Sequence, residues 1–272
     1  RWFPQATMNT EKIILLTGAD KKIRRQEMLL SQVLQTGYIS VEEISRRFDV
    51  TPQTARRDLA DLLRSGKVRR CHGGMTPAVP FDTTTRRIRR TQNTAAKRRI
   101  ADAVADLVSD GETLFLDSGS TMEAIAHALA RKRRNLELAT TSVRIGVELS
   151  ERDDFSVHLP SGTVRGGDNT IIGEAVAPWL LSHRFDVMIM TVGGVSESGE
   201  LTVDTPIEVP ILSAAVSVSK RIIVAADRTK LEFRAPEPLM PTSMIDDFVT
   251  DATLSRPLLA RLESDRVKIH SL

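Results

Sequence analysis

Apolar side chains in the first quarter of the chain recur every three or four positions, which is the spacing of one helix face. The pattern occupies three short segments, residues 22–35, 41–48 and 52–63, and Gly37 closes the first of them. The third segment would bury Ala55, Leu59, Leu62 and Leu63. Three short amphipathic helices in succession predict a small helical domain.

Polar residues mark the starts of the second and third helices. Ser40 and Glu43 form a capping box, in which Ser40 Oγ accepts the Glu43 N–H and the Glu43 carboxylate bonds back to the Ser40 N–H. Thr51 is an N-cap candidate, and Pro52 then occupies the first helical position. These signals predict two short helices with a tight turn between them.

From residue 112 onward, short apolar runs alternate with helical ones. The strand-like runs are residues 113–117, 136–140, 155–159, 186–190, 221–226 and 246–250. The helix-like runs are residues 121–130, 143–150, 173–182, 206–218 and 255–264. This alternation is typical of an α/β fold with a mainly parallel sheet, in which ligands bind at the carboxyl ends of the strands.

Charge divides the chain near residue 100. Residues 21–100 hold 19 Lys and Arg against 7 Asp and Glu, a net charge of +12, whereas residues 101–272 hold 17 against 26, a net charge of −9. A basic domain attracts a polyanion, so the division indicates nucleic-acid binding by the N-terminal part. Basic residues that merely solvate surface helices would give the same count.

Composition narrows the class of protein further. Hydrophobic residues make up 41% and charged residues 27% of the chain, as in globular proteins, and no apolar run approaches the roughly 20 residues of a membrane helix. The first ten residues lack the apolar region of a signal peptide, and those before Met8 fit a tag or an upstream extension. The single cysteine, Cys71, excludes an internal disulfide and fits a reducing cytoplasm, so we expect a cytoplasmic protein.

The second and third predicted helices together form a helix-turn-helix. Amide and guanidinium groups on the exposed face of the third helix suit base contacts, because Gln pairs with adenine and Arg with guanine. Arg57 either holds a phosphate or pairs with Asp61 one turn later. A small dimerisation module is the alternative, although it would not need the basic face. The DNA-binding candidates on this motif are Ser40, Thr51, Gln53, Thr54, Arg56 and Arg57.

The segment after Gly66 alternates as a strand and predicts a basic wing beside the duplex, with Lys67, Arg69 and Arg70 as further DNA-binding candidates. The residues that follow have the Gly and Pro content of a linker. We therefore predict a winged helix-turn-helix domain over residues 21–74, a linker over 75–94 and an α/β domain over 95–272.

The strand end Asp117–Thr121 has the chemistry of a phosphate-binding loop. Gly119 allows a sharp turn, and the helix that starts near Thr121 offers unpaired N–H groups and the positive end of its dipole. The hydroxyl groups of Ser118, Ser120 and Thr121 are additional donors. A helix capped by Ser and Thr without any ligand would have the same sequence.

Other predicted strand ends carry further candidates for ligand contact. Lys230 would neutralise an anion or lie in an ordinary surface turn. Asp204 and Glu208 would bond polyol hydroxyls or cap the helix near residue 206. These candidates are Thr141, Ser142, Gly193, Gly194, Asp204, Glu208 and Lys230.

Residues 39–74, with an Arg-Arg-Asp-Leu run at 56–59 and Gly-Gly at 73–74, strongly resemble the DNA-binding head of the DeoR family of bacterial repressors. Residues 97–251 look like the sensor domain of that family, and the two matches cover most of the chain. The resemblance implies an α/β sensor related in fold to ribose-5-phosphate isomerase, which binds a phosphorylated sugar or polyol.

The resemblance also assigns roles to the candidate residues. It implies that residues 118–121 hold the phosphate, that Lys97 and Lys230 lie nearby, and that Asp204 and Glu208 face the polyol end of the effector.

Two segments depart from the family pattern near the expected site. Thr141-Ser142 stands where the family often has Thr-Asn, and Ser161-Gly162 stands where it has Gly-Gly. Gly162 therefore joins the candidates for effector contact.

A sugar-phosphate isomerase with an appended head is the alternative function. The related enzymes carry acids at the end of the fourth strand, where this chain has Thr191–Gly194, although Asp204 and Glu208 remain candidate bases. We expect no catalytic site, metal or cofactor. The DNA-binding head favours a transcriptional repressor, a homodimer or homotetramer on repeated operator half-sites, whose effector shifts its affinity for DNA.

Overall fold

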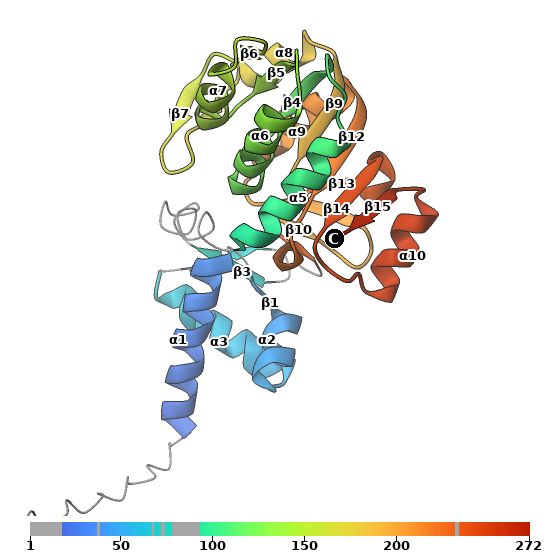
Figure 1. Cartoon of the computed structure of the whole chain (residues 1–272). Helices are drawn as coiled ribbons and strands as arrows, with labels where there is room; N and C mark the ends of the chain where they lie inside the picture. The colour runs from blue at the N-terminus through green and yellow to red at the C-terminus, as the bar shows by residue number, and fades with distance from the viewer. Residues whose placement is uncertain (1–17, 37–38, 67, 72–73, 78–92, 232–233) are drawn as a thin grey trace, which may run out of the picture.

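The computed structural model describes residues 18–36, 39–66, 68–71, 74–77, 93–231 and 234–272 of the chain. Its buried apolar side chains form three clusters, one within residues 29–75 and two within residues 100–267. The first cluster is the core of an N-terminal head, and the other two cover opposite faces of one sheet. The two parts are coloured blue to cyan and green to red in Figure 1.

The head is a winged helix-turn-helix, as the cap signals predicted. Its elements are α1 (Gly18–Thr36), β1 (Ile39–Ser40), α2 (Val41–Phe48), α3 (Pro52–Arg64), β2 (Val68–Cys71) and β3 (Gly74–Pro77). Strand β3 lies between β1 and β2 and pairs antiparallel with both. Asp49 ends α2 with a left-handed backbone conformation, which turns the chain toward α3.

The predicted helix caps are confirmed, with one correction. Ser40 Oγ accepts a hydrogen bond from Glu43 N at 3.0 Å, and Thr51 Oγ1 accepts one from Thr54 N at 3.2 Å. The carboxylate of Glu43, for which we predicted a return bond to Ser40, instead accepts a hydrogen bond from Gln32 Nε2 at 3.1 Å. Glu43 thus ties α2 to α1, because the longer α1 brings Gln32 within its reach.

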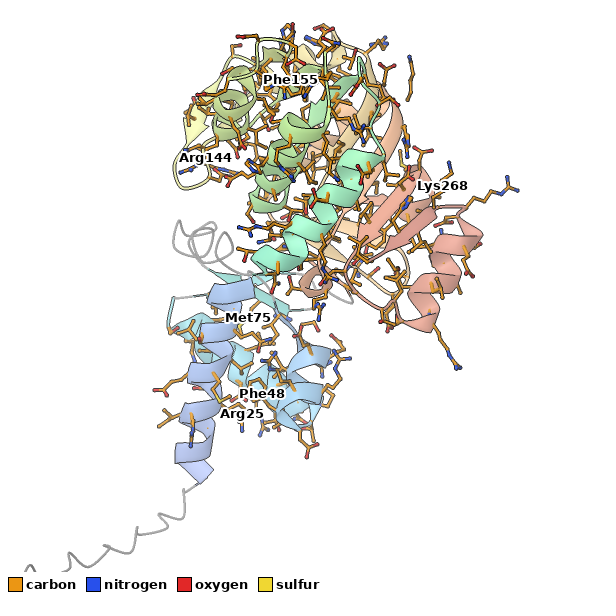
Figure 2. The ribbon with its side chains drawn as sticks, viewed as in Figure 1. Arg25, Phe48, Met75, Arg144, Phe155 and Lys268 are labelled. Atoms are coloured by element: carbon orange, nitrogen blue, oxygen red, sulfur yellow. The ribbon has the colours of Figure 1, made fainter. Side chains whose placement is uncertain are left out.

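The wing extends further than its composition indicated. We predicted a linker from residue 75, but Gly74–Pro77 form β3, and Met75 is fully buried in the head core. Figure 2 shows Met75 near the upper end of α1. Glycine, threonine and proline lowered the strand signal there, while pairing on both sides of β3 stabilises the strand. Residue 67 and residues 78–92 lie outside the described residues.

The large domain is built on seven parallel strands. Their order across the sheet is β15-β14-β12-β9-β4-β5-β6, and every neighbouring pair is parallel. The strands are β4 (Thr113–Leu116), β5 (Glu137–Thr140), β6 (Ser156–His158), β9 (Phe185–Met190), β12 (Ser219–Ala225), β14 (Asp247–Thr250) and β15 (Lys268–Ser271). The predicted α/β fold with a mainly parallel sheet is confirmed.

Helices cover both faces of this sheet, as Figure 1 shows. They are α5 (Thr94–Asp106), α6 (Ser120–Lys132), α7 (Val143–Ser150), α8 (Val176–Leu181), α9 (Glu208–Ser217) and α10 (Arg256–Ser264). Alternation along β4 explains the two cores, since Leu114 and Leu116 pack with α5, α6 and α7, whereas Phe115 packs with α8, α9 and α10. No helix within the described ranges is long and apolar enough to span a bilayer.

The chain reverses its direction of travel across the sheet beside β4. It adds β5 and β6 on one side, then returns to place β9 on the other side of β4, followed by β12, β14 and β15. The gap between the carboxyl ends of β4 and β9 is therefore the topological switch point, where open α/β sheets bind ligands. Asp117 follows β4 and Thr191 follows β9. We call the ends of the parallel strands around these two residues the carboxyl edge.

Short strands outside the main sheet escaped the sequence pattern. They are β7 (Thr163–Arg165), β8 (Thr170–Ile172), β10 (Gly194–Val195), β11 (Glu200–Val203) and β13 (Glu237–Pro241). β7 and β8 form an antiparallel hairpin, and β10, β11 and β13 form a small antiparallel sheet. Two to five residues contain too few alternations to be distinguished from a loop, and the predicted helix at 173–182 is accordingly only the single turn and a half of α8.

Candidate functional site

Helix α3 presents one polar face to solvent. Gln53, Arg56 and Arg57 are exposed on it, while Ala55 and Leu59 are buried on the opposite face. Thr54 is half-buried, and its hydroxyl lies 3.0 Å from that of Thr51. The structure therefore brings the amide and the two guanidinium groups together, whereas the two threonine hydroxyls stabilise the start of the helix.

Asp58 is a residue of this helix to which the sequence pattern assigned no role. Its side chain is 1% exposed and accepts hydrogen bonds from Arg25 Nε at 2.6 Å and from Gln26 Nε2 at 3.1 Å. Figure 2 shows Arg25 on α1 beside α3. The sequence feature that could have identified Asp58 is an acidic residue between the apolar positions of an amphipathic helix. Asp58 fixes α3 against α1 and so orients the exposed face of α3.

Asp61, which we considered as a partner for Arg57, binds other side chains. The Asp61 carboxylate binds Lys22, Gln26 and Arg64, and the hydrogen bond from Lys22 is the main cause that lowers the pKa of Asp61 to about 2. The carboxylate that we considered as a partner for Arg57 is thus occupied by α1 and by the end of its own helix.

The wing adds positive charge on β2. Arg70 is exposed there, and Arg69 precedes it in the same strand. Lys67 and the side chain of Arg69 lie outside the described residues. Ser40 is half-buried and its hydroxyl caps α2, as described above.

The predicted phosphate loop lies at the switch point. Helix α6 begins at Ser120, and Gly119 before it has a φ of 111°, which favours glycine. A Cβ atom at position 119 would lie 3.7 Å from Thr191 Cγ2, so the loops after β4 and β9 are in contact. Met122 and Ile125 are fully buried and hold the first turn of α6 against the sheet.

Lys97 contacts this loop from α5. Its side chain is 6% exposed, and its Nζ donates a hydrogen bond to Ser120 Oγ at 3.0 Å. A buried ammonium group at the start of a helix provides positive charge at the same point as the helix dipole. Lys97, Gly119 and Ser120 therefore form an arrangement suited to an anion.

A second residue of α5 contacts a different loop. Arg99 lies 3.8 Å from the carboxylate of Asp251, which follows β14 and is almost completely buried. Arg228 also binds Asp251, with its backbone N–H at 2.9 Å and its Nε at 2.9 Å. The first turns of α5 thus contact the loops after β4 and β14.

Asp117 is the most perturbed acid at the carboxyl edge. The pKa of its carboxyl group is raised to about 7, mainly by burial and in part by the nearby Glu208 carboxylate. Backbone N–H groups of Ser118 and Thr191 and the guanidinium group of Arg165 act in the opposite direction. A carboxyl group with a pKa near 7 is present in both the neutral and the ionised form at neutral pH.

Asp204 and Glu208 lie on the β9 side of the switch point. Glu208 Oε2 accepts hydrogen bonds from the backbone N–H groups of Asp204 at 3.2 Å and Thr205 at 3.3 Å. A Cβ atom at position 193 would lie 3.1 Å from Asp204 Oδ1, so Gly193 makes room for that carboxylate. The helix cap that we predicted as one alternative for these acids is not formed, because the N-cap position of α9 is Ile207 without a side-chain cap, and Glu208 instead binds the loop before the helix. Hydroxyl binding by these acids stays a prediction.

Arg165 and Asp168 belong to the β7–β8 hairpin and were missed by the sequence pattern. Arg165 binds Asp168 through two nitrogens, at 3.3 and 2.7 Å, and its Nη2 lies 3.4 Å from Glu208 Oε1. Residues 166 and 167 are both glycines, which concealed the strands on either side of them. We call Asp117, Arg165, Asp168 and Glu208 the Arg165 cluster.

Three candidates have mainly structural contacts. Ser142 is 1% exposed and its Oγ caps α7, while Thr141, also 1% exposed, accepts the N–H of Ile171 at its carbonyl oxygen at 2.7 Å. A Cβ atom at position 162 would lie 2.6 Å from the carbonyl oxygen of Ile172, so Gly162 allows the close approach at the open end of the hairpin. These residues hold the hairpin against the loop after β5.

Lys230 ends a short 3-10 helix (Arg228–Lys230) after β12 and is half-buried. The bridge between Val195 and Leu231 sets this segment beside β10, which begins at Gly194. The carboxylate of Asp227, which precedes this helix, accepts hydrogen bonds from Thr229 N at 2.9 Å and Thr229 Oγ1 at 2.5 Å. Within the described part of the chain, no group of His, Cys, Asp and Glu side chains could hold a metal ion.

A basic winged helix-turn-helix joined to a parallel α/β domain defines a class of two-part DNA-binding regulators. Two family models agree with this assignment: the DeoR-like helix-turn-helix domain matches residues 25–78, and the DeoR C terminal sensor domain matches residues 92–252. The chain belongs to the DeoR family.

Curated relatives extend over nearly the whole chain. The chain is 34% identical over 232 residues to the glycerol-3-phosphate regulon repressor of Escherichia coli (strain K12), a match that covers 85% of this chain and 92% of the relative. It is 30% identical over 245 residues to the HTH-type transcriptional repressor CsqR of the same strain, covering 90% and 94%. The chain is therefore a transcriptional repressor of the DeoR family, a regulator and not an enzyme.

Solved structures with partial similarity include ribose 5-phosphate isomerase A from Neisseria gonorrhoeae, with a TM-score of 0.36, 19% identity and coverage of 50% of this chain and 52% of that one. A transcriptional regulator from Streptococcus pneumoniae TIGR4 has a TM-score of 0.38 and 12% identity, covering 64% and 87%.

Proposed function

We propose that this repressor controls a carbohydrate or polyol catabolic operon and that a phosphorylated polyol or sugar, glycerol 3-phosphate or a sugar phosphate, binds at the carboxyl edge of the sheet. The observation that carries the proposal is the hydrogen bond from buried Lys97 to Ser120, at the first turn of α6 and at the switch point. The name of the glycerol-3-phosphate regulon repressor supports the same class of effector.

The chemistry of the loop supports a phosphate group in particular. Helix α6 has 13 residues, so the N–H groups of its first turn and its dipole favour a negative charge. The hydroxyls of Ser118, Ser120 and Thr121 would donate to phosphate oxygens. A phosphate oxygen is a stronger acceptor for the Lys97 ammonium group than the neutral Ser120 hydroxyl, because charge-assisted hydrogen bonds are about twice as strong as neutral ones.

Helix α5 would carry the effect of binding toward the head. It is the first described helix after the wing, and its Lys97 would exchange a hydroxyl partner for the effector's phosphate. An effector changes DNA affinity only if it binds the DNA-competent and the other conformation unequally. We propose that the position of the α5 N-terminus differs between these two conformations.

On DNA, the exposed face of α3 would enter the major groove and the wing would contact the backbone. Gln53 and Arg56 would contact bases, and Arg57 and Arg70 would hold phosphates. We propose that the repressor acts as a homodimer or homotetramer, because helix-turn-helix proteins bind half-sites about one helical turn apart.

A thermal-shift experiment on the full chain tests the effector. Glycerol 3-phosphate, ribose 5-phosphate and fructose 6-phosphate would each be added, with glycerol and sodium sulfate as controls for the polyol and the anion alone. A ligand at about 100 times its Kd adds about 2.7 kcal/mol to the stability of the native state, which shifts Tm by several degrees. An effector should also change the affinity for operator DNA in fluorescence anisotropy.

The matched variant is Ser120→Ala, which removes the hydroxyl group at the start of α6 without changing the backbone. It should weaken binding of the phosphate compound about tenfold, while Ser150→Ala, an exposed serine at the end of α7, should leave it unchanged. If no phosphorylated compound raises the Tm of the wild type, the proposed effector class is wrong.

A further inference from the structure

We infer that Arg165 is a specificity-determining residue of the sensor domain, which contacts the hydroxyl-bearing chain of the effector and selects a neutral polyol chain over a chain that carries a carboxylate. This inference rests on the proposed function, because it concerns the end of the effector away from the phosphate. The argument starts from the position of the β7–β8 hairpin.

The turn end of the hairpin is held against the loop after β5. Ile171 N donates to the Thr141 carbonyl oxygen at 2.7 Å, Val143 N donates to the Asn169 carbonyl oxygen at 3.0 Å, and Ser142 bridges Thr170. From this anchored hairpin, Arg165 reaches Glu208 at the start of α9, which follows β11. Its side chain therefore spans the carboxyl edge from the β5 side to the β9 side.

Asp117 lies between these two sides, at the end of β4. Both Arg165 and Glu208 are near enough to alter the pKa of Asp117, the first lowering it and the second raising it. Strand β4 is adjacent to β5 on one side and to β9 on the other. The guanidinium group thus lies near the end of β4, the strand that leads into the predicted phosphate loop.

The charges at this end differ from those at the phosphate loop. Asp117, Asp168 and Glu208 are acids, and Arg165 is the cation that binds two of them. A chain hydroxyl both donates and accepts, so it can donate to a carboxylate oxygen and accept from the guanidinium group at the same time. A carboxylate on the effector would accept from Arg165 but be repelled by the ionised carboxylates beside it.

An unpaired hydroxyl group in the same hairpin points independently to a ligand. Thr170 is 5% exposed, and its Oγ1 is buried with no hydrogen-bond partner among the described residues. Its backbone N–H donates to Asp168 Oδ1 at 3.3 Å, beside the carboxylate that holds Arg165. A buried hydroxyl without a partner is destabilising, and an effector hydroxyl would supply that partner.

The test compares two phosphate esters of the same carbon-chain length. Glycerol 3-phosphate has two hydroxyl groups and propyl phosphate has none, so the ratio of their dissociation constants isolates the polyol contribution. Arg165→Gln should lower the preference for glycerol 3-phosphate over propyl phosphate by roughly tenfold or more, since hydrogen bonds to charged groups are among the stronger ones. The Kd of propyl phosphate should stay the same. Isothermal titration calorimetry on the full-length protein measures both.

Two further variants and one ligand sharpen the result. Arg165→Lys should recover part of the preference, because it keeps a positive donor but loses the planar fork. Arg256→Gln, which removes an exposed arginine from the start of α10, is the charge-matched control and should change neither Kd. The wild type should also bind 3-phosphoglycerate, which carries a carboxylate, more weakly than glycerol 3-phosphate.

The possible outcomes separate this inference from the proposed function. Three outcomes would overturn the role of Arg165 and leave the phosphate site standing. They are an unchanged preference in Arg165→Gln, an equal loss of affinity for both esters, and a wild type that binds both esters equally. If neither ester binds the wild type, the proposed function fails, and the inference fails with it. Thermal unfolding of the ligand-free variants establishes that each is folded before titration.

Discussion

Replacement of Asp117 by asparagine should make the stability of the sensor domain less dependent on pH. The pKa of Asp117 is about 7 in the folded protein, against 3.8 for the same group in a flexible chain. Because the folded pKa is the higher one, folding takes up a proton between these two values. The stabilising effect is complete below pH 3.8 and is lost as the pH rises through about 7.

The magnitude follows from the two pKa values. Each pH unit between them costs about 1.4 kcal/mol of folding free energy, so the wild type should lose about 3 kcal/mol between pH 5 and pH 8 through this group. Asparagine does not ionise and keeps an oxygen that accepts a backbone N–H. Asp117→Asn should therefore gain about 3 kcal/mol relative to the wild type over the same pH interval.

Urea denaturation at pH 5, 6, 7 and 8 measures this difference. Trp179 on α8 reports on the sensor domain, and other ionisable groups cancel between the two proteins. Asp153→Asn, at an exposed aspartate, makes the same charge change outside the carboxyl edge and should show no such trend. If the stability difference between Asp117→Asn and the wild type varies by less than about 0.5 kcal/mol from pH 5 to pH 8, the assigned environment of Asp117 is wrong.

Two predictions concern the head. Arg56→Ala should cost about 1–3 kcal/mol of operator binding and relax base preference at one position, as measured by fluorescence anisotropy with operator and mutated duplexes. A uniform loss of affinity for all DNA would make Arg56 a phosphate contact, and unchanged binding would refute a DNA-contacting role for Arg56. Asp58→Ala should destabilise the head by about 3 kcal/mol, because it leaves Arg25 partly buried without its carboxylate partner. Circular dichroism during urea denaturation measures the unfolding of the head. If the urea midpoint of the head is unchanged, the Arg25–Asp58 ion pair does not fix α3 against α1.

Much of the fold could be predicted because it depends on local signals. The caps at Ser40 and Thr51 and the alternation of strands and helices after residue 112 are each encoded within a few adjacent residues. The loop over residues 117–121, for which we predicted phosphate binding, is also a local feature, since its glycine, hydroxyl groups and helix start are contiguous. Local chemistry of this kind does not depend on how the rest of the chain folds.

The remaining parts of the site depend on contacts between distant segments. Arg165 and Glu208 are 43 positions apart, and Asp58 meets Arg25 across 33 positions. The sequence indicates that each residue is charged but not which partner it will meet. The β7–β8 hairpin was missed for a related reason, because strands of three residues are stabilised by their pairing partners more than by their own pattern.

Two polar contacts join helix α5 to segments that follow strands of the sheet, Lys97 with Ser120 and Arg99 with Asp251. Strands β9 and β12 lie between the two strands that carry these loops, so the helix spans a breadth of four strands. We expect a helix held in this way to move as a rigid body. Substitutions that strengthen either contact should make the domain harder to unfold and also slower to respond, so thermal robustness and regulatory sensitivity are opposing demands on the same side chains.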